Sequence, residues 1–191
     1  MKDRRRTNSH KERSLWKGAV AGLIGGLVAS WTMNQFQAAL SKATEGFEKP
    51  HGAQSMQPSE GEDASHASEN NKQDQDDATV KAARAISEIF GHELKESEKE
   101  LGGAVVHYAF GTATGGLYGA FAELAPEVTV GAGLPFGAAF WLVADETAVP
   151  LLGLSKGPSE YPVSTHAYAL TSHLVFGLTA ELVRSALRRV L

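Results

Sequence analysis

Ionisable side chains interrupt stretches that are otherwise apolar, and they are the residues of this 191-residue chain best suited to chemistry. An ionisable group in lipid is costly, so such groups are expected to face the protein interior or a polar path. Threading four predicted helices alternately through a bilayer sorts these groups into two layers. The outer layer comprises His107, Asp145, Glu146, His166 and His173, with Asn34 at similar depth. The inner layer comprises Glu123, Glu181 and Arg184.

The outer layer is open to three interpretations. Imidazoles near a carboxylate are able to bind a divalent metal such as zinc. They are equally able to relay protons, since histidine titrates near neutral pH. The third interpretation is that each histidine bonds a neighbouring helix and only fixes the packing. No HExxH motif is present, so the metal is unknown, and no cofactor is predicted apart from this divalent-metal alternative.

The inner layer is predicted to be structural. Glu181 and Arg184 are three residues apart on one predicted helix, a spacing at which their charges pair. Glu123 is expected to join them and complete a clamp. The sequence contains no phosphate-binding loop, serine nucleophile elbow or dinucleotide fingerprint, so no catalytic residue is predicted and the chain is expected not to be an enzyme.

Glycines recur at intervals of about four residues in the apolar stretches. This small-residue spacing lets helix backbones approach closely in a membrane. In a water-soluble helix each glycine costs about 1 kcal/mol relative to alanine, which favours the membrane over a soluble helical bundle. The ridges are also suited to packing a homo-oligomer. The predicted packing glycines are Gly18, Gly22, Gly26, Gly111, Gly115, Gly119, Gly133, Gly137 and Gly177.

The elements that position these groups are predicted to form an all-α, polytopic membrane bundle of about four transmembrane helices. The predicted transmembrane helices are 15–40, 102–124, 128–149 (ended by Pro150) and 166–186, the last three lying in the membrane region 102–191. Residues 41–77 hold too few apolar side chains for a core and are predicted to be a disordered polar loop. Residues 78–101 are predicted to form an amphipathic helix and linker, with the helix lying on the membrane surface or packing on the bundle end.

Charged flanks predict the orientation. The net charge of −4 conceals a basic arm at residues 1–14, and Arg184, Arg188 and Arg189 close the last helix. Basic flanks face the cytoplasm, so both termini are expected there, in a bacterial inner membrane. The arm is assigned to the lipid bilayer and not to nucleic acid, and the first apolar run is expected to be retained, not cleaved as a signal peptide.

A set of polar and helix-ending residues in the second half of the chain resembles the YagU-like bacterial inner-membrane proteins over about 102–191. The residues that carry the resemblance are His107, Tyr118, Ala122, Glu123, Pro126, Gly131, Gly137, Pro150, Gly153, Leu154, His173, Glu181 and Arg184. The resemblance implies a multi-pass inner-membrane protein of unassigned biochemistry, loosely associated with tolerance of acid.

The resulting expectation is a non-enzymatic inner-membrane protein that responds to stress or pH. Two alternatives stay open: a small component of a proton or ion transporter or channel, and a membrane-embedded metal-binding protein or enzyme.

Overall fold

The computed structural model describes residues 14–43 and 77–191. The predicted basic arm and polar loop lie almost entirely outside the described residues. Within these two ranges the regular structure is helical throughout, with no strand, which confirms the predicted all-α class.

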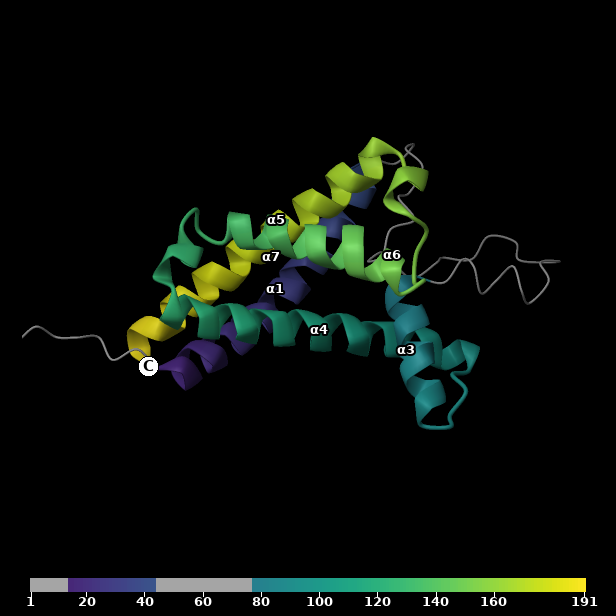
Figure 1. Ribbon diagram of the computed structural model, residues 1–191, viewed down its shortest axis with the longest axis horizontal. Coiled ribbons are helices and arrows are strands. Elements are labelled where there is room, and N and C mark those ends of the chain that lie inside the picture. Colours follow the sequence, from purple (N-terminus) through teal and green to yellow (C-terminus); the bar gives the residue numbers. More distant parts are fainter. Residues whose placement is uncertain (1–13, 44–76) are drawn as a thin grey trace, which may run out of the picture.

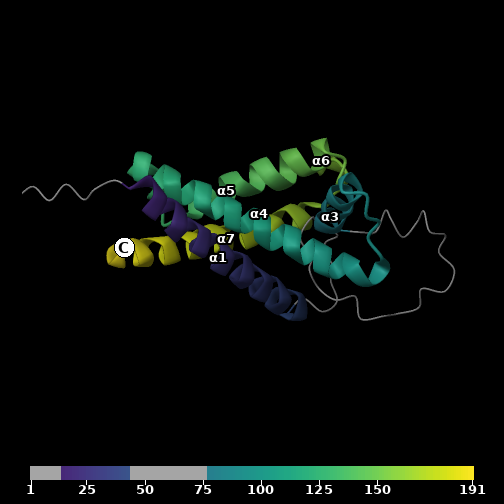
Figure 2. The ribbon, with the colours of Figure 1, turned by 90° about the horizontal axis from the view of Figure 1, so that it is seen from below.

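Three long helices form the frame of the bundle: α1 (Leu15–Ala43), α4 (Glu96–Leu124) and α7 (Val163–Val190). Each extends beyond its predicted limits, and at 1.5 Å per residue each is roughly 42–44 Å long. α1 packs against both α4 and α7, and the shorter α5 (Leu134–Val143) packs against α7 (Figures 1 and 2). Helices that follow one another along the bundle are antiparallel, so the start of α1 and the end of α7 lie together, and the Lys17 Nζ donates to the Leu191 carbonyl over 2.7 Å.

The third predicted helix, 128–149, has different limits in the structure. Pro126–Thr129 forms a 3-10 turn, and Gly131, Ala132 and Gly133 all have positive φ, so α5 begins only at Leu134. Gly133 thus caps α5 in the left-handed conformation, which glycine adopts without strain, and from this position it still packs closely on Gly177 of α7. The helical path then continues past Val143 and does not stop at Pro150.

A π-helical turn at Ala144–Ala148 joins α5 to a short helix, α6 (Val149–Leu151). A proline ring in a regular helix clashes with the carbonyl four residues earlier, which for Pro150 is that of Glu146. Glu146 lies inside the π turn, where the backbone is wider, and Pro150 is therefore accommodated at the start of α6. The predicted limit at 149 is therefore two residues short, because the helical path ends at Leu151.

A transverse helix, α3 (Ala78–Ile89), crosses the N-terminal end of α4 (Figure 1). Two glycines of α4 make room for it, because a β-carbon at Gly103 would lie 2.9 Å from Cγ2 of Val80, and one at Gly102 would lie 3.1 Å from Cβ of Ala83. α4 begins at Glu96, inside the predicted linker. Its first turn is capped by Glu98, whose carboxylate accepts the backbone N–H of Lys95 over 2.9 Å, and this bond lowers the pKa of Glu98.

The middle of the bundle is closed by an apolar cluster. Ala29 and Met33 of α1 meet Phe176 and Ala180 of α7, and Phe136 and Phe140 of α5 pack against them. Taking the described helices one at a time, none is at once long enough and apolar enough on average to cross a membrane.

Candidate functional site

Close backbone contacts between α1 and α4 position the polar groups of the interior. A β-carbon at Gly115 would lie 2.5 Å from the carbonyl oxygen of Gly22 and 2.6 Å from Cα of Gly26. Gly18 meets Gly119 in the same way, and Gly26 meets Gly111. These contacts lie within one chain, so the ridges are already filled and a second copy would have to pack on another face.

The second close contact joins α5 and α7. A β-carbon at Gly177 would lie 2.7 Å from the backbone nitrogen of Gly137, and Gly133 and Gly137 meet the backbone of Gly177 and His173. Side chains on the facing surfaces of α1, α4, α5 and α7 are consequently brought close enough to bond.

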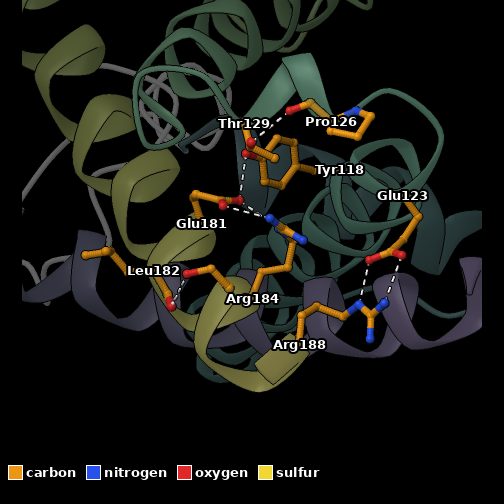
Figure 3. Close-up of polar contacts among 9 residues, drawn as sticks. Tyr118, Glu123, Pro126, Thr129, Glu181, Leu182, Arg184 and Arg188 are labelled. Atoms are coloured by element: carbon orange, nitrogen blue, oxygen red, sulfur yellow. Dashed lines mark hydrogen bonds and ion pairs between the residues drawn. The ribbon is translucent and has the colours of Figure 1, made fainter. Parts of the chain in front are cut away.

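The inner polar layer contains two carboxylates, each held by an arginine (Figure 3). Glu181 receives two bonds of 2.7 Å from Arg184, and the hydroxyl of Tyr118 donates to the same carboxylate over 2.8 Å. Such two-pronged bonds between guanidinium and carboxylate are among the strongest polar contacts in proteins. The three side chains are buried and join α4 to α7.

Glu123 does not join Glu181 and Arg184 as the sequence pattern suggested. It is bonded by Arg188 over 2.5 and 2.9 Å, and it accepts the backbone N–H of Ser14 over 3.3 Å (Figure 3). The inner layer therefore consists of two separate pairs. Arg188 lies one helical turn after Arg184 on the same face of α7, so the i,i+4 spacing marks it as a second arginine within reach of this layer but does not say which arginine binds Glu123.

The outer layer centres on His173, whose side chain is fully buried. Its Nδ1 hydrogen-bonds the Ala169 carbonyl over 2.9 Å and lies 3.6 Å from Oδ2 of Asp145. Oδ1 of Asp145 is buried without a hydrogen-bond partner in the described structure, and only 10% of the side chain is exposed. A buried carboxylate held this loosely is energetically costly while it is charged.

His107 approaches the same centre from α4. Its imidazole hydrogen-bonds the backbone of Ser30 and lies near enough to His173 for their charges to interact. The Nε2 atom of His107 is buried with no partner within the described ranges. The Asn34 Nδ2 donates to the hydroxyl of neighbouring Tyr108 over 3.2 Å, which places Asn34 beside this group.

Glu146 forms a separate pair. It contacts Nδ1 of His166 at 2.6 Å, while Nε2 of His166 bonds the Pro158 carbonyl at 3.0 Å. The outer residues therefore divide into a buried centre (His107, Asp145 and His173) and a half-buried pair nearer the bundle end. The π turn lets the adjacent residues Asp145 and Glu146 reach two histidines of α7 that are seven residues apart.

Two features of this arrangement bear on its chemistry. The aromatic rings of Phe136, Phe140 and Phe176 pack between the two polar layers, so the layers are separated by apolar side chains. In addition, no group of three or more histidine and acidic side chains with metal-binding geometry is present in the described part of the chain.

Residues 89–182 match the model of a family described as "Protein of unknown function (DUF1440)". The matched stretch includes α4, α5, the π turn and most of α7, and thus contains every histidine of the outer layer; α1 lies outside it. No curated protein and no solved structure matches the chain. The match is consistent with an uncharacterised family and does not confirm membership of the YagU-like proteins.

Proposed function

We propose that this chain is a non-enzymatic membrane-embedded protein, a helical bundle whose outer surface faces lipid and whose buried His–Asp centre responds to protons. One observation carries the proposal: the usual distribution of residues is reversed, with small and polar side chains inside and large apolar ones outside. In water-soluble proteins charged residues are rarely buried, and large contiguous apolar patches mark membrane or protein contacts.

The reversal is clearest on α1. Its large apolar residues recur three and four positions apart and are exposed, including Leu27 at 49% and Trp31 at 56%. Its buried positions are glycine, alanine and serine, with Met33 and Gln37 near the end. A water-soluble amphipathic helix has the opposite arrangement.

α4 repeats the pattern. Phe110, Leu117 and Phe121 are exposed, whereas the buried face carries glycines, Tyr118, His107 and Glu123. The mean hydropathy of such a helix is low because its inner face is glycine and polar, even though its outer face is apolar. The proposal rests on the direction in which the side chains point, not on the average over the helix.

The start of α1 and the end of α7 lie at the same end of the bundle, which supports an even number of membrane crossings between them. The start of α1 and the end of α7 are joined by Lys17 and Leu191, and α3 and α6 lie at the opposite end (Figure 1). With the basic flanks, this arrangement favours both termini in the cytoplasm of a bacterial inner membrane, with the outer centre nearer the far side.

The proton response is proposed for the centre of His107, Asp145 and His173. Asp145 has a buried oxygen without a donor, and His107 has a buried nitrogen without a partner. Protonation of the carboxylate removes an uncompensated charge, so Asp145 contributes stability to the folded bundle as the pH falls, whereas protonation of the buried imidazoles of His107 and His173 would add charge and oppose it. The apolar layer between the two polar layers argues against a transport role, because it interrupts the polar path that such a role needs.

A single charge among the exposed apolar residues of α1 tests the membrane assignment. Leu27→Asp places a carboxylate where lipid is proposed, at a cost of about 2.5–3.5 kcal/mol for a helix centre. The variant should be lost from the membrane fraction, whereas the wild type should stay there after alkaline washing and require detergent for extraction. In a water-soluble bundle the same exposed substitution would leave expression and folding unchanged, and alkaline washing would release the wild type.

Labelling tests the orientation. The chain contains no native cysteine, so single cysteines report cleanly. With an impermeant reagent on cells whose outer membrane has been opened, Ser159→Cys should be labelled and Ser9→Cys should not. The reverse pattern would contradict the proposed orientation while leaving the membrane assignment intact.

A further inference from the structure

The transverse helix α3 has three distinct faces. At about 100° per residue, Val80, Ala83 and Ser87 share one face. This face packs on α4, where Val80 contacts Gly103 and Ala83 contacts Gly102. One third of the helix circumference is therefore committed to the bundle.

The other two faces are chemically opposite. Lys81, Arg84 and Glu88 lie on one side of the packed face, about 40–100° from Val80 on the helical wheel. Ile86 and Ile89 lie on the remaining face, with Phe90 directly after the helix. Ile89 is 81% exposed and Phe90 is 83% exposed, so the apolar face has no cover within the described residues.

The orientation of α3 relative to the bundle suits a helix with one charged and one apolar face. Figure 1 shows α3 running across α4, and Figure 2 places it at the same end of the bundle. If the bundle axis crosses a bilayer, α3 then runs along the bilayer surface. The exposed apolar residues of α4 begin at Leu101 and Val105, which flank in sequence the glycines Gly102 and Gly103 that contact α3, so exposed apolar side chains are present on both helices at this end of the bundle.

We propose that α3 is an interfacial helix that docks on the surface of the same bilayer, with Ile86, Ile89 and Phe90 inserted below the lipid headgroups. A helix with one apolar and one charged face fits the boundary between acyl chains and water. The third face holds α3 on α4, so its depth is fixed by the bundle. This inference rests on the membrane assignment and adds a specific lipid contact that the bundle by itself does not require.

Depth-dependent quenching tests the contact. Full-length protein carrying Ile89→Cys is labelled with an environment-sensitive fluorophore and reconstituted into phosphatidylcholine–phosphatidylglycerol vesicles. Some of the lipids carry a nitroxide either near the headgroup or deep in the acyl chain. Glu88→Cys, the adjacent residue on the charged face, is the matched control, and Leu117→Cys on the outer face of α4 reports the bundle. Phe90→Cys provides a second probe if Ile89→Cys fails to fold by circular dichroism.

The shallow nitroxide should quench the probe at Ile89 several-fold more than the probe at Glu88, and the deep nitroxide should quench the probe at Leu117. Equal, weak quenching at Ile89 and Glu88 with strong quenching at Leu117 would overturn the docking of α3 and leave the membrane assignment standing. Weak quenching at all three positions would overturn both. A probe at Ile89 that is shielded from both nitroxides and becomes exposed on dilution of the protein would identify a second copy as the occupant and also overturn the proposal.

Discussion

Buried carboxylates occur at both ends of the bundle, but they are held differently. At the end of the bundle where α7 finishes, Glu181 and Glu123 each accept two hydrogen bonds from an arginine, and Glu181 accepts a third from Tyr118. At the other end Asp145 faces a histidine at 3.6 Å with one oxygen unbonded. The backbone differs too, because the inner pairs stand on regular helices and Asp145 stands on a π turn, a feature that is frequent at functional sites.

This difference indicates which layer stabilises the fold and which layer is able to change its protonation state. A fully bonded pair between buried charges resists any change of protonation, since losing one partner leaves the other uncompensated. The Asp145 carboxylate, with one unbonded oxygen and a single imidazole at 3.6 Å, has no such constraint. The inner layer therefore fixes the helices, and the outer centre is available to respond to its surroundings.

The largest effect is expected from breaking an inner pair. Arg184→Met leaves the buried Glu181 carboxylate with Tyr118 alone, and removal of one partner of a buried pair costs about 3–5 kcal/mol. Unfolding of the detergent-solubilised protein, followed by circular dichroism, measures the loss. The exposed Arg189→Met is the matched control and should change little. The double variant Glu181→Gln with Arg184→Met should recover part of the stability, and failure to see any loss in the single variant would contradict the structural role of this layer.

The glycine contact that holds α1 against α4 between the two layers should give the next largest effect. Gly115→Ala places a methyl group 2.5 Å from a backbone oxygen, and overpacking of this kind costs about 1–3 kcal/mol. The adjacent Gly116→Ala is the control, because its methyl group would meet the flexible side chain of Leu23 at 2.7 Å and not backbone. The difference in thermal midpoint between the two variants is the measurement. Equal midpoints would mean that α1 and α4 are further apart at Gly115 than the structure shows.

A smaller effect, with a characteristic pH dependence, is expected in the outer centre. Asp145→Asn removes a charge that lacks a hydrogen-bond donor, so its stability at neutral pH should stay within about 1 kcal/mol of the wild type or exceed it. The stability of the wild type should rise relative to that of Asp145→Asn as the pH falls, because protonation of Asp145 removes the charge that the substitution removes. Thermal midpoints of wild type, Asp145→Asn, His107→Ala and His173→Ala are compared from about pH 8 to pH 4.5, a range that spans histidine titration. Parallel curves would show that the centre only packs, and a shift on adding zinc that His173→Ala abolishes would restore the metal alternative.

The smallest effect lies outside both layers, at the cap of α4. The pKa of Glu98 is lowered mainly by its bond from the Lys95 backbone, with a contribution from His92 that adds to this effect and a partial desolvation that opposes it. A lowered pKa means that the cap is formed at neutral pH and is lost as the pH falls through the pKa of Glu98. Glu98→Gln should speed amide exchange in the first turn of α4 at neutral pH and leave the global midpoint unchanged. A large drop in the midpoint would show that this end of α4 is part of the cooperative core.

Several features could be predicted because they depend on local pattern. The helical class follows from apolar residues spaced three and four apart, and the close approach of α1 and α4 follows from glycines at Gly22, Gly26 and Gly115. The pairing of Glu181 with Arg184 follows from their i,i+3 spacing on one helix. Each inference needs only the geometry of a single helix, which the sequence specifies directly.

Other features could not be predicted because they depend on how different helices meet. The choice of Arg188 as the partner of Glu123 depends on the distance between α4 and α7, and nothing in either segment alone distinguishes Arg188 from Arg184. Gly133 packs closely on Gly177, as predicted for a glycine at this position, but its left-handed cap could not be predicted because a packing glycine and a capping glycine look alike in the sequence. The π turn was also missed, although adjacent acidic residues directed at one neighbouring helix were a signal that a regular helix would not suffice.

The sequence by itself determined that this protein is helical, that its helices approach closely through glycine, and that ionisable groups lie within apolar stretches. Only the tertiary structure decided which of these groups are bonded and which are left open. The reason is that helical periodicity fixes the direction of a side chain relative to its own axis, whereas a buried hydrogen bond depends on the rotation and depth of a second helix. Those two quantities are set by packing across the whole bundle, and they separate the closed pairs at Glu123 and Glu181 from the open carboxylate of Asp145.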